Sequence, residues 1–152
     1  LSVATSEEML QACLKNYETS DAVLMAAAVA DFKPTNHTNK KIKKQDGLDA
    51  ISLVPTVDIL SQLGNAKKHQ VLIGFALESE NAMVNAQQKL IRKNLDAIVV
   101  NSLVDDGAGF GHETNKISFL QPDKDAVHYP LKSKNDVAID VLAHLKNIFD
   151  AQ

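Results

Sequence analysis

The chain alternates between short apolar runs and segments in which apolar residues recur at helical spacing. Three runs without a polar interruption cover residues 22–30, 71–77 and 97–100. Such runs are typical of strands that are covered on both faces, as in a parallel sheet. The second and third runs flank a helical pattern over 79–94, which predicts a strand–helix–strand unit with a right-handed crossover.

Helix starts are marked by capping residues. Thr5 with Glu8 predicts a capping box at the start of a helix that ends near residue 18. Thr56 is expected to cap a second helix, and Ser133 with Asp136 a last one. Residues 116–121 and 127–131 read as a C-terminal hairpin.

The segment 33–55 is expected to protrude. It is polar and rich in Lys and Asn, and it ends in a short strand, 50–55, that Pro55 restricts to an edge. The predicted fold is α/β: a three-layer, Rossmann-like, doubly wound, mostly parallel sheet with a protruding arm and a C-terminal hairpin. A short apolar stub precedes the first helix, so we expect one domain, 1–152, that lacks its N-terminal strands.

The composition and charge of the chain argue against several classes of function. The net charge of −3 argues against sequence-independent nucleic-acid binding. No apolar run approaches a membrane span, and no signal peptide is readable, so we expect no membrane partner. The single cysteine, Cys13, excludes an internal disulfide and fits a cytoplasmic protein. The five histidines do not fall at metal-ligand spacings.

Each apolar run ends at a residue that could act on a ligand. Asp31, Glu78 and Asn101 follow the three runs, and ligands of open α/β sheets collect at the carboxyl ends of strands. Gly74, inside the second run, suggests close approach by a backbone or a ligand. The alternative for Asp31 is an ordinary turn after a buried strand.

Two groups of lysines suggest an anionic ligand. Lys89 and Lys93 are four residues apart on one helix face, although their spacing alone favours a solvated face with cations near the helix C-terminus. Four more cations, Lys40, Lys41, Lys43 and Lys44, lie in the arm, where they could instead protect an edge strand. Together the groups suit a polyphosphate. The GAGFG stretch at 107–111 leads into no helix, so a dinucleotide fingerprint is not indicated.

Taken together, these segments resemble the phosphopantothenate–cysteine ligases (phosphopantothenoylcysteine synthetases) of bacterial coenzyme A biosynthesis, the CTP-dependent type that is often the C-terminal half of a bifunctional protein. The matching pieces follow the family's order over nearly the whole chain: VATSEEM (3–9), AAAVADFKP (26–34), KIKK (41–44), PTVDIL (55–60), VLIGFALESEN (71–81), LIRKNLDAIVVN (90–101) and GFGHETNKI (109–117).

The resemblance implies a ligase that joins 4′-phosphopantothenate to L-cysteine. The substrate carboxylate attacks the α-phosphorus of CTP, and cysteine then displaces CMP from the acyl-cytidylate. Mg²⁺ would accompany CTP, and no flavin is expected in this chain. The family is dimeric, with the arm, 33–55, reaching toward the partner and the active site, so a homodimer is expected.

The resemblance also implies the site residues. Lys41 matches an arm lysine that is needed to turn over the acyl-cytidylate, and Val57 stands where a common family form has Pro. Asn115 lies in a matching loop without an implied role. The expected nucleotide-binding residues are Met25, Ala26, Ala27, Asp31, Lys41, Thr56, Val57, Asp58, Ile59, Phe75, Lys89 and Lys93.

The chain departs from the family's sequence at one point, and two alternative functions remain open. The family's opening strand, its Gly-rich turn and an Asn-bearing segment would precede Leu1, so this chain alone is expected to be weakly active or inactive. A nicotinamide-dependent oxidoreductase is the first alternative, which the missing glycine fingerprint disfavours. A non-enzymatic nucleotide-binding module is the second, because it could keep the lysines without activating an acid.

Overall fold

The structure is a computed structural model that describes residues 1–36, 38, 40–43, 50–78, 81–102, 107–108 and 111–151. Lys44 and the Gly109 region of the GAGFG stretch therefore lie outside the described residues, as does the expected start of the third helix at 79–80. The elements are α1 (Ser6–Tyr17), β1 (Ala22–Met25), β2 (Phe32–Pro34), β3 (Leu53–Pro55), α2 (Ile59–Ala66), β4 (Val71–Glu78), α3 (Ala82–Arg92), β5 (Ala97–Ser102), β6 (Thr114–Asn115), β7 (Ile117–Leu120), β8 (Val127–His128), β9 (Lys132–Ser133) and α4 (Lys134–Phe149).

The central sheet has the strand order β1-β4-β5-β7-β8. Strands β1, β4 and β5 are parallel, while β7 and β8 continue the sheet in antiparallel pairs. Because β4, α3 and β5 follow one another and the two strands pair in parallel, the expected strand–helix–strand unit is confirmed. The C-terminal hairpin is confirmed by the β7–β8 pair.

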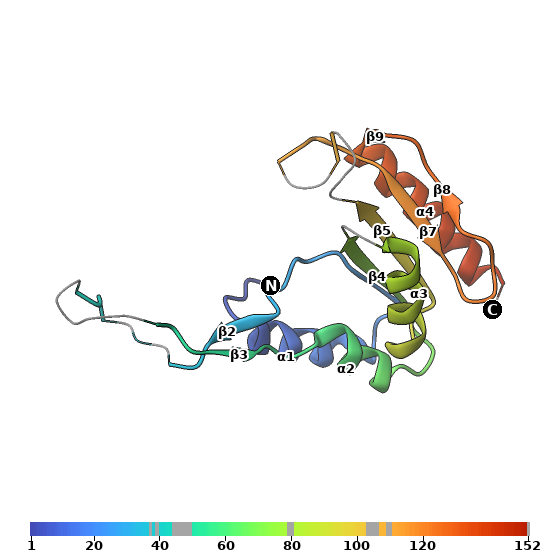
Figure 1. The fold of residues 1–152 in the computed structure, drawn as a ribbon. Helices are drawn as coiled ribbons and strands as arrows, with labels where there is room; N and C mark the ends of the chain where they lie inside the picture. The colour runs from blue at the N-terminus through green and yellow to red at the C-terminus, as the bar shows by residue number, and fades with distance from the viewer. Residues whose placement is uncertain are drawn as a thin grey trace.

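Helices cover both faces of the sheet, which confirms the three-layer fold (Figure 1). Alternate residues of β4 point to opposite faces: Leu72 and Ala76 pack with α1, α2 and α3, while Val71 and Ile73 pack with α4. On the α4 face, Phe119 is fully buried against the helix residues Val137 and Val141. The strands β4 and β5 are therefore buried on both faces, as their uninterrupted apolar runs predict.

The first strand is shorter and more exposed than the sequence predicts. β1 ends at Met25 rather than at residue 30, and among the described strands it pairs only with β4. After Met25 the chain leaves the sheet. It then makes a turn, in which the Val29 amide donates a hydrogen bond to the Ala27 carbonyl at 3.1 Å. The remaining apolar residues thus form a loop, and the expectation of a strand covered on both faces was wrong for β1.

The second helix is capped by Asp58 and not by Thr56. The Asp58 carboxylate accepts from the Ser61 amide at 3.0 Å, and the helix begins at Ile59. The Thr56 side chain does not cap the helix, because its hydroxyl donates a hydrogen bond to the Ala30 carbonyl in the loop after β1. The capping box of Thr5 and the cap of Ser133 are confirmed.

Gly64 and Gly74 mark close packing inside the fold. A Cβ atom on Gly64 would lie 1.9 Å from the carbonyl oxygen of Lys93, so glycine lets α2 contact the end of α3. A Cβ atom on Gly74 would meet side chains, Leu60 at 2.8 Å and Leu95 at 2.9 Å. The expectation of a backbone or ligand against Gly74 was therefore wrong, because apolar side chains fill that space.

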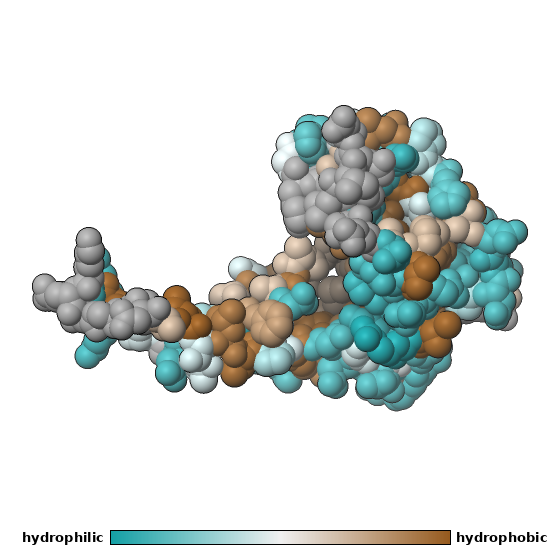
Figure 2. Space-filling view, viewed as in Figure 1, coloured by the Kyte–Doolittle hydropathy of each residue, from teal (hydrophilic) through white to brown (hydrophobic). Residues whose placement is uncertain are grey.

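The arm is anchored by a short antiparallel pair and projects away from the sheet (Figure 1). Strands β2 and β3 pair Phe32 with Pro55, so the predicted strand 50–55 forms only in its second half. Lys33 makes an ion pair with Glu7 of α1, which holds the base of the arm to the body. Apolar side chains remain exposed on the arm, as the brown patches in Figure 2 show: Phe32, Ile42, Ile51 and Leu53.

Candidate functional site

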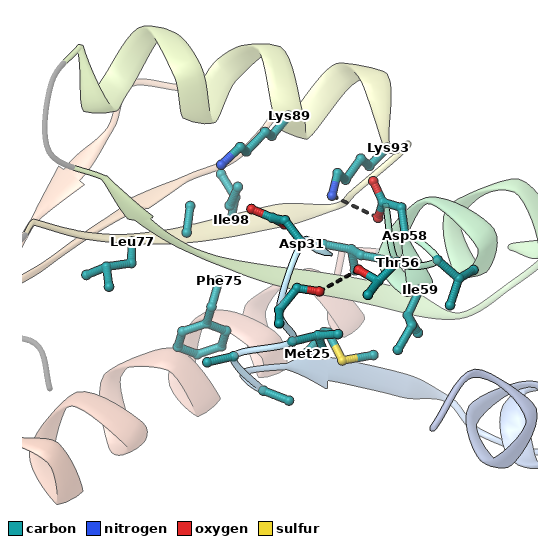
Figure 3. A pocket seen from close by; sticks show the side chains of 17 residues that line it. Met25, Asp31, Thr56, Asp58, Ile59, Phe75, Leu77, Lys89, Lys93 and Ile98 are labelled. Carbon is teal, nitrogen blue, oxygen red and sulfur yellow. Dashed lines mark hydrogen bonds and ion pairs between the residues drawn. The ribbon is translucent and has the colours of Figure 1, made fainter. Parts of the chain in front are cut away.

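A cavity of about 570 Å³ opens at the carboxyl end of β1 and β4. Three segments form its walls: the loop after β1, the start of α2, and the face of α3 that carries Lys89 and Lys93 (Figure 3). Phe75, Ala76 and Leu77 of β4 contribute the sheet side. The cavity thus lies where an open α/β sheet collects its ligands.

Thr56 joins two walls of the cavity. Its hydroxyl donates to the Ala30 carbonyl, and its amide donates to the Asp31 carbonyl at 2.8 Å. These bonds fix the loop that carries Asp31 against the start of α2. In Figure 3 the Asp31 side chain points toward the helix that carries both lysines.

Lys93 is held at the second wall by the acid that caps α2. Its Nζ lies 2.9 Å from the Asp58 carboxylate, and its side chain is only 15% exposed. Burial raises the pKa of the Asp58 carboxyl, but hydrogen bonds from Lys93 and Ser61 outweigh burial and leave that pKa below its ordinary value. Asp58 is therefore ionised at neutral pH.

Lys89 is held by a different acid. Its Nζ lies 2.5 Å from a carboxylate oxygen of Glu78, the last residue of β4. Both lysines thus line the cavity while paired to carboxylates. Lys93 is therefore largely buried and ion-paired, whereas Lys89 is ion-paired but 37% exposed.

Almost all of the expected nucleotide-binding residues meet in this cavity. It is lined by Met25, Ala27, Asp31, Thr56, Val57, Asp58, Ile59, Phe75, Lys89 and Lys93. Ala26 lies instead on a second cavity. Lys41 is on the arm and does not line either cavity of the described residues.

The second cavity, of about 560 Å³, lies on the α4 side of the sheet. It shares Ala27, Ala28 and the Phe75–Leu77 stretch with the first cavity, so the two are separated by β4 and the loop after β1. Asn101 and Asn115 lie at this second cavity. In the sequence, Asp31, Glu78 and Asn101 follow three apolar runs, yet of these only Asp31 lines the first cavity and Asn101 lines the second.

The sequence indicated some contributors to the first cavity only weakly. Leu60 and Ile98 read as ordinary core residues, yet both line it. The sequence places the acid Glu78 directly after a predicted strand but does not predict its pairing with Lys89. The available signal was its place directly after an apolar run, which it shares with Asp31.

The comparisons with known proteins decide the family. The profile of the DNA/pantothenate metabolism flavoprotein C-terminal domain matches residues 1–149. The chain belongs to this family. Its membership confirms the resemblance stated from the sequence, because relatives named coenzyme A biosynthesis bifunctional protein CoaBC align with most of the chain.

Two relatives show how much of a longer protein the chain represents. The CoaBC protein of Bacillus subtilis is 43% identical over 143 residues, which are 94% of this chain and 35% of that protein. A protein of an unknown prokaryotic organism, named cysteine/cysteine sulfinic acid decarboxylase, is 46% identical over 93% of this chain and 40% of its own length. The chain therefore spans less than half of each relative, and a name given to the whole protein does not assign an activity to the shared part.

Solved structures support the fold. The crystal structure of the C-terminal domain of a CoaBC protein superposes with a TM-score of 0.81 at 33% identity, covering 100% of this chain and 68% of that one. A Cab2 mutant in complex with phosphopantothenate-cysteine has a TM-score of 0.63 at 21% identity, with coverage of 86% and 46%. The second likeness is one of fold alone.

The described residues contain no group of three or more His, Cys, Asp or Glu that could hold a metal ion. Nor does any helix in the described part of the chain have the length and apolar character needed to span a membrane.

Proposed function

We propose that this domain binds CTP in the first cavity and uses it to join 4′-phosphopantothenate to cysteine. The observation that carries the proposal is the pair Lys89 and Lys93, one turn apart on α3, both lining a cavity at the carboxyl end of the sheet. Membership of the CoaBC family supports the same reaction.

The cavity offers distinct surfaces to the two ends of a nucleotide. The base and ribose would lie against the loop residues Met25 and Ala27 and the β4 stretch at Phe75. Lys89 and Lys93 supply the opposite wall, where their ammonium groups would bind the phosphates. The remaining nucleotide contacts would come from the start of α2, with Val57 and Ile59.

The reaction requires an anion to approach a polyanion. The phosphopantothenate carboxylate attacks the α-phosphorus of CTP, the bond to the β-phosphate oxygen breaks, and pyrophosphate leaves. The amine of cysteine then attacks the acyl carbon, loses a proton, and releases CMP. Cations that neutralise the phosphates, together with fixed positions of the reactants, supply most of the help that a protein can give such a step.

The charges around the cavity favour a nucleotide that carries a divalent cation. Three carboxylates, of Asp31, Asp58 and Glu78, stand against the two ammonium groups of Lys89 and Lys93. Asp58 and Glu78 are each paired with a lysine, which leaves Asp31 as the carboxylate available to a cation. Mg²⁺ is ordinarily bound by one or two carboxylates plus substrate phosphates, so Asp31 fits it, and the ion would offset the phosphate charge there.

We further propose that the arm, 33–55, mediates a homodimer and brings Lys41 to the acyl-cytidylate. Ile51 and Leu53 on the arm, and Phe32 directly before it, are each more than half exposed, which favours burial against a second copy. Sedimentation at micromolar concentration tests this: a dimer that Phe32→Ser dissociates supports the arm's role, and a wild-type monomer contradicts it.

Calorimetric titration of the chain with CTP in Mg²⁺ tests the nucleotide site. We expect selective binding of CTP over ATP and NADH, and a loss of at least about 100-fold in affinity for Lys89→Ala/Lys93→Ala, because two charge-assisted hydrogen bonds are removed. The matched control is Lys68→Ala/Lys146→Ala, which removes two lysines from exposed ion pairs elsewhere.

Each outcome separates the candidate functions. CTP binding that only the cavity variant loses supports the site, and preferential NADH binding favours the oxidoreductase. Release of pyrophosphate from CTP with phosphopantothenate present supports the ligase. CTP binding without that release favours a binding module only in a hybrid protein, in which this chain replaces the matching part of the B. subtilis CoaBC protein, because the chain alone is expected to be weakly active or inactive.

A further inference from the structure

Glu78 occupies an unusual place for a carboxylate. It is the last residue of β4, its side chain is only 10% exposed, and it does not line the cavity itself. A buried carboxylate is costly unless it is paired and hydrogen-bonded. This one is fully engaged, since one oxygen accepts from Lys89 at 2.5 Å and the other accepts from the Asn85 side chain at 3.1 Å.

Both partners of Glu78 lie on one face of α3, because Asn85 and Lys89 are four residues apart. The carboxylate therefore joins the end of the sheet to the helix at two points. The N-cap of the helix, Asn81, makes no side-chain capping bond among the described residues and has a left-handed backbone with φ 51°. Glu78 thus fixes the position of α3 over the cavity as well as the direction of Lys89.

The consequence differs for the two lysines. Lys93 is 15% exposed and lies at the C-cap of α3, where the contact between α2 and α3 at Gly64 also restrains it. Lys89 is 37% exposed, and among the described residues its ion-pair partner is Glu78. A lysine has a flexible four-carbon stem, so Lys89 depends on Glu78 for a fixed position.

We infer that Glu78 is a positioning residue for nucleotide binding: it holds the Lys89 ammonium at the rim of the cavity, where it meets the phosphates. This inference rests on the proposed function, because it presumes that Lys89 binds the phosphates of CTP. Glu78 does not touch the nucleotide and acts only through Lys89 and α3.

A double-mutant cycle in CTP affinity tests the inference. Glu78→Gln keeps the shape of the side chain and, with a flipped Asn85 amide, both hydrogen bonds, but it removes the charge. We expect it to weaken CTP binding about tenfold, which corresponds to about 1.4 kcal/mol. In the Lys89→Met background the same change is expected to alter the affinity less than twofold, because the group through which Glu78 acts is gone.

Two further variants keep the test decisive. Glu78→Asp retains the charge on a shorter side chain and is expected to restore part of the affinity that Glu78→Gln loses. Glu18→Gln is the matched control, since Glu18 also pairs with a lysine, Lys68, but is exposed and lies at the end of α1. Thermal unfolding of each variant separates a loss of folding from a loss of binding.

The outcomes distinguish this inference from the proposed function. If the wild-type chain does not bind CTP, the nucleotide site itself fails. If the wild type binds CTP but Glu78→Gln binds it equally or more tightly, the site stands and the positioning role is overturned. A tenfold loss that persists in the Lys89→Met background also overturns it, because Glu78 then acts independently of Lys89.

Discussion

The two groups of lysines that suggested an anionic ligand have opposite structural settings. Lys89 and Lys93 belong to a helix packed on the sheet, and each is paired to a carboxylate at the edge of the cavity. Lys41 belongs to an arm that projects from the body and is fastened to it near its base. The body therefore holds its cations in place before a ligand arrives, whereas the arm needs another surface to position its own.

This contrast separates two tasks. Binding of phosphates benefits from groups that are fixed in advance, because less side-chain freedom is lost on binding. A group that acts later, on an intermediate, can be supplied by a segment that moves or by a second copy of the chain. The predictions below test whether the body and the arm differ in this way.

The largest effect is expected where the wall of the cavity is most tightly packed. Gly64→Ala would place a Cβ atom 1.9 Å from the Lys93 carbonyl oxygen and force α2 away from α3. Although alanine normally stabilises a helix by about 1 kcal/mol over glycine, we expect a loss of at least about 3 kcal/mol in the free energy of unfolding, because backbone atoms must move. Urea unfolding measures it.

Gly111→Ala is the control for that change. Gly111 has a positive φ of 77°, but a Cβ atom there would meet no atom of the described residues within 4 Å. The cost is expected to be about 1–2 kcal/mol, from the backbone conformation alone. Equal costs at Gly64 and Gly111 would contradict the close contact between α2 and α3.

A matched pair of leucines compares the body with the arm. Leu63 of α2 is fully buried, and Leu53 of β3 is 57% exposed. Leu63→Ala is expected to lower the free energy of unfolding by about 2–5 kcal/mol, and Leu53→Ala by less than about 0.5 kcal/mol, measured by urea unfolding at a concentration where the chain is monomeric. A larger loss for Leu53→Ala would mean that the arm packs against the body.

The Asp58–Lys93 pair predicts a pH-dependent contribution to stability. The pKa of the folded Asp58 carboxyl lies below its ordinary value of 3.8, so the folded state favours the ionised form. The stabilisation is complete above that ordinary value and is lost as the pH falls through the lower folded pKa.

Asp58→Asn measures this contribution. Asparagine also caps helices well, and the Asp58 side chain is 47% exposed, so we expect a loss of only about 0.5–1 kcal/mol at neutral pH. The difference in unfolding free energy between wild type and variant should shrink below pH 3.8. A difference that is constant across this range would show that the ion pair contributes nothing.

The smallest effect is expected from the arm lysine. Lys41→Gln should leave the Kd for CTP unchanged within about twofold, because in this structure Lys41 does not line the cavity. Calorimetric titration beside Lys89→Ala checks it. A tenfold loss for Lys41→Gln would instead mean that the arm closes over the bound nucleotide.

The fold was largely predictable because its signals are local. The apolar runs at β4 and β5 are buried on both faces, so each reads as a strand without knowledge of its partners. The apolar run 22–30 was predicted to be one strand, but only Ala22–Met25 forms it. The small apolar residues Ala26–Ala28 border the two cavities instead. Composition does not distinguish a strand interior from a cavity wall.

The site was predictable mainly through the family resemblance, since the residues alone left both lysines open to a solvated reading. What escaped prediction depends on contacts between distant segments. Thr56 and Asp58 are both good caps, and only the bond from Thr56 to Ala30 determines which one caps α2. In the same way, the pairing of Glu78 with Lys89 requires that α3 fold back over the end of β4.

The central claim, that the body alone holds the phosphates of CTP, is tested most directly by a crystal structure of the chain with CTP and Mg²⁺. The account predicts that the triphosphate lies within hydrogen-bonding distance of the Nζ atoms of Lys89 and Lys93, with Asp31 beside the metal. CTP bound in the cavity on the α4 side, or at the arm with both lysines still paired only to Glu78 and Asp58, would contradict it.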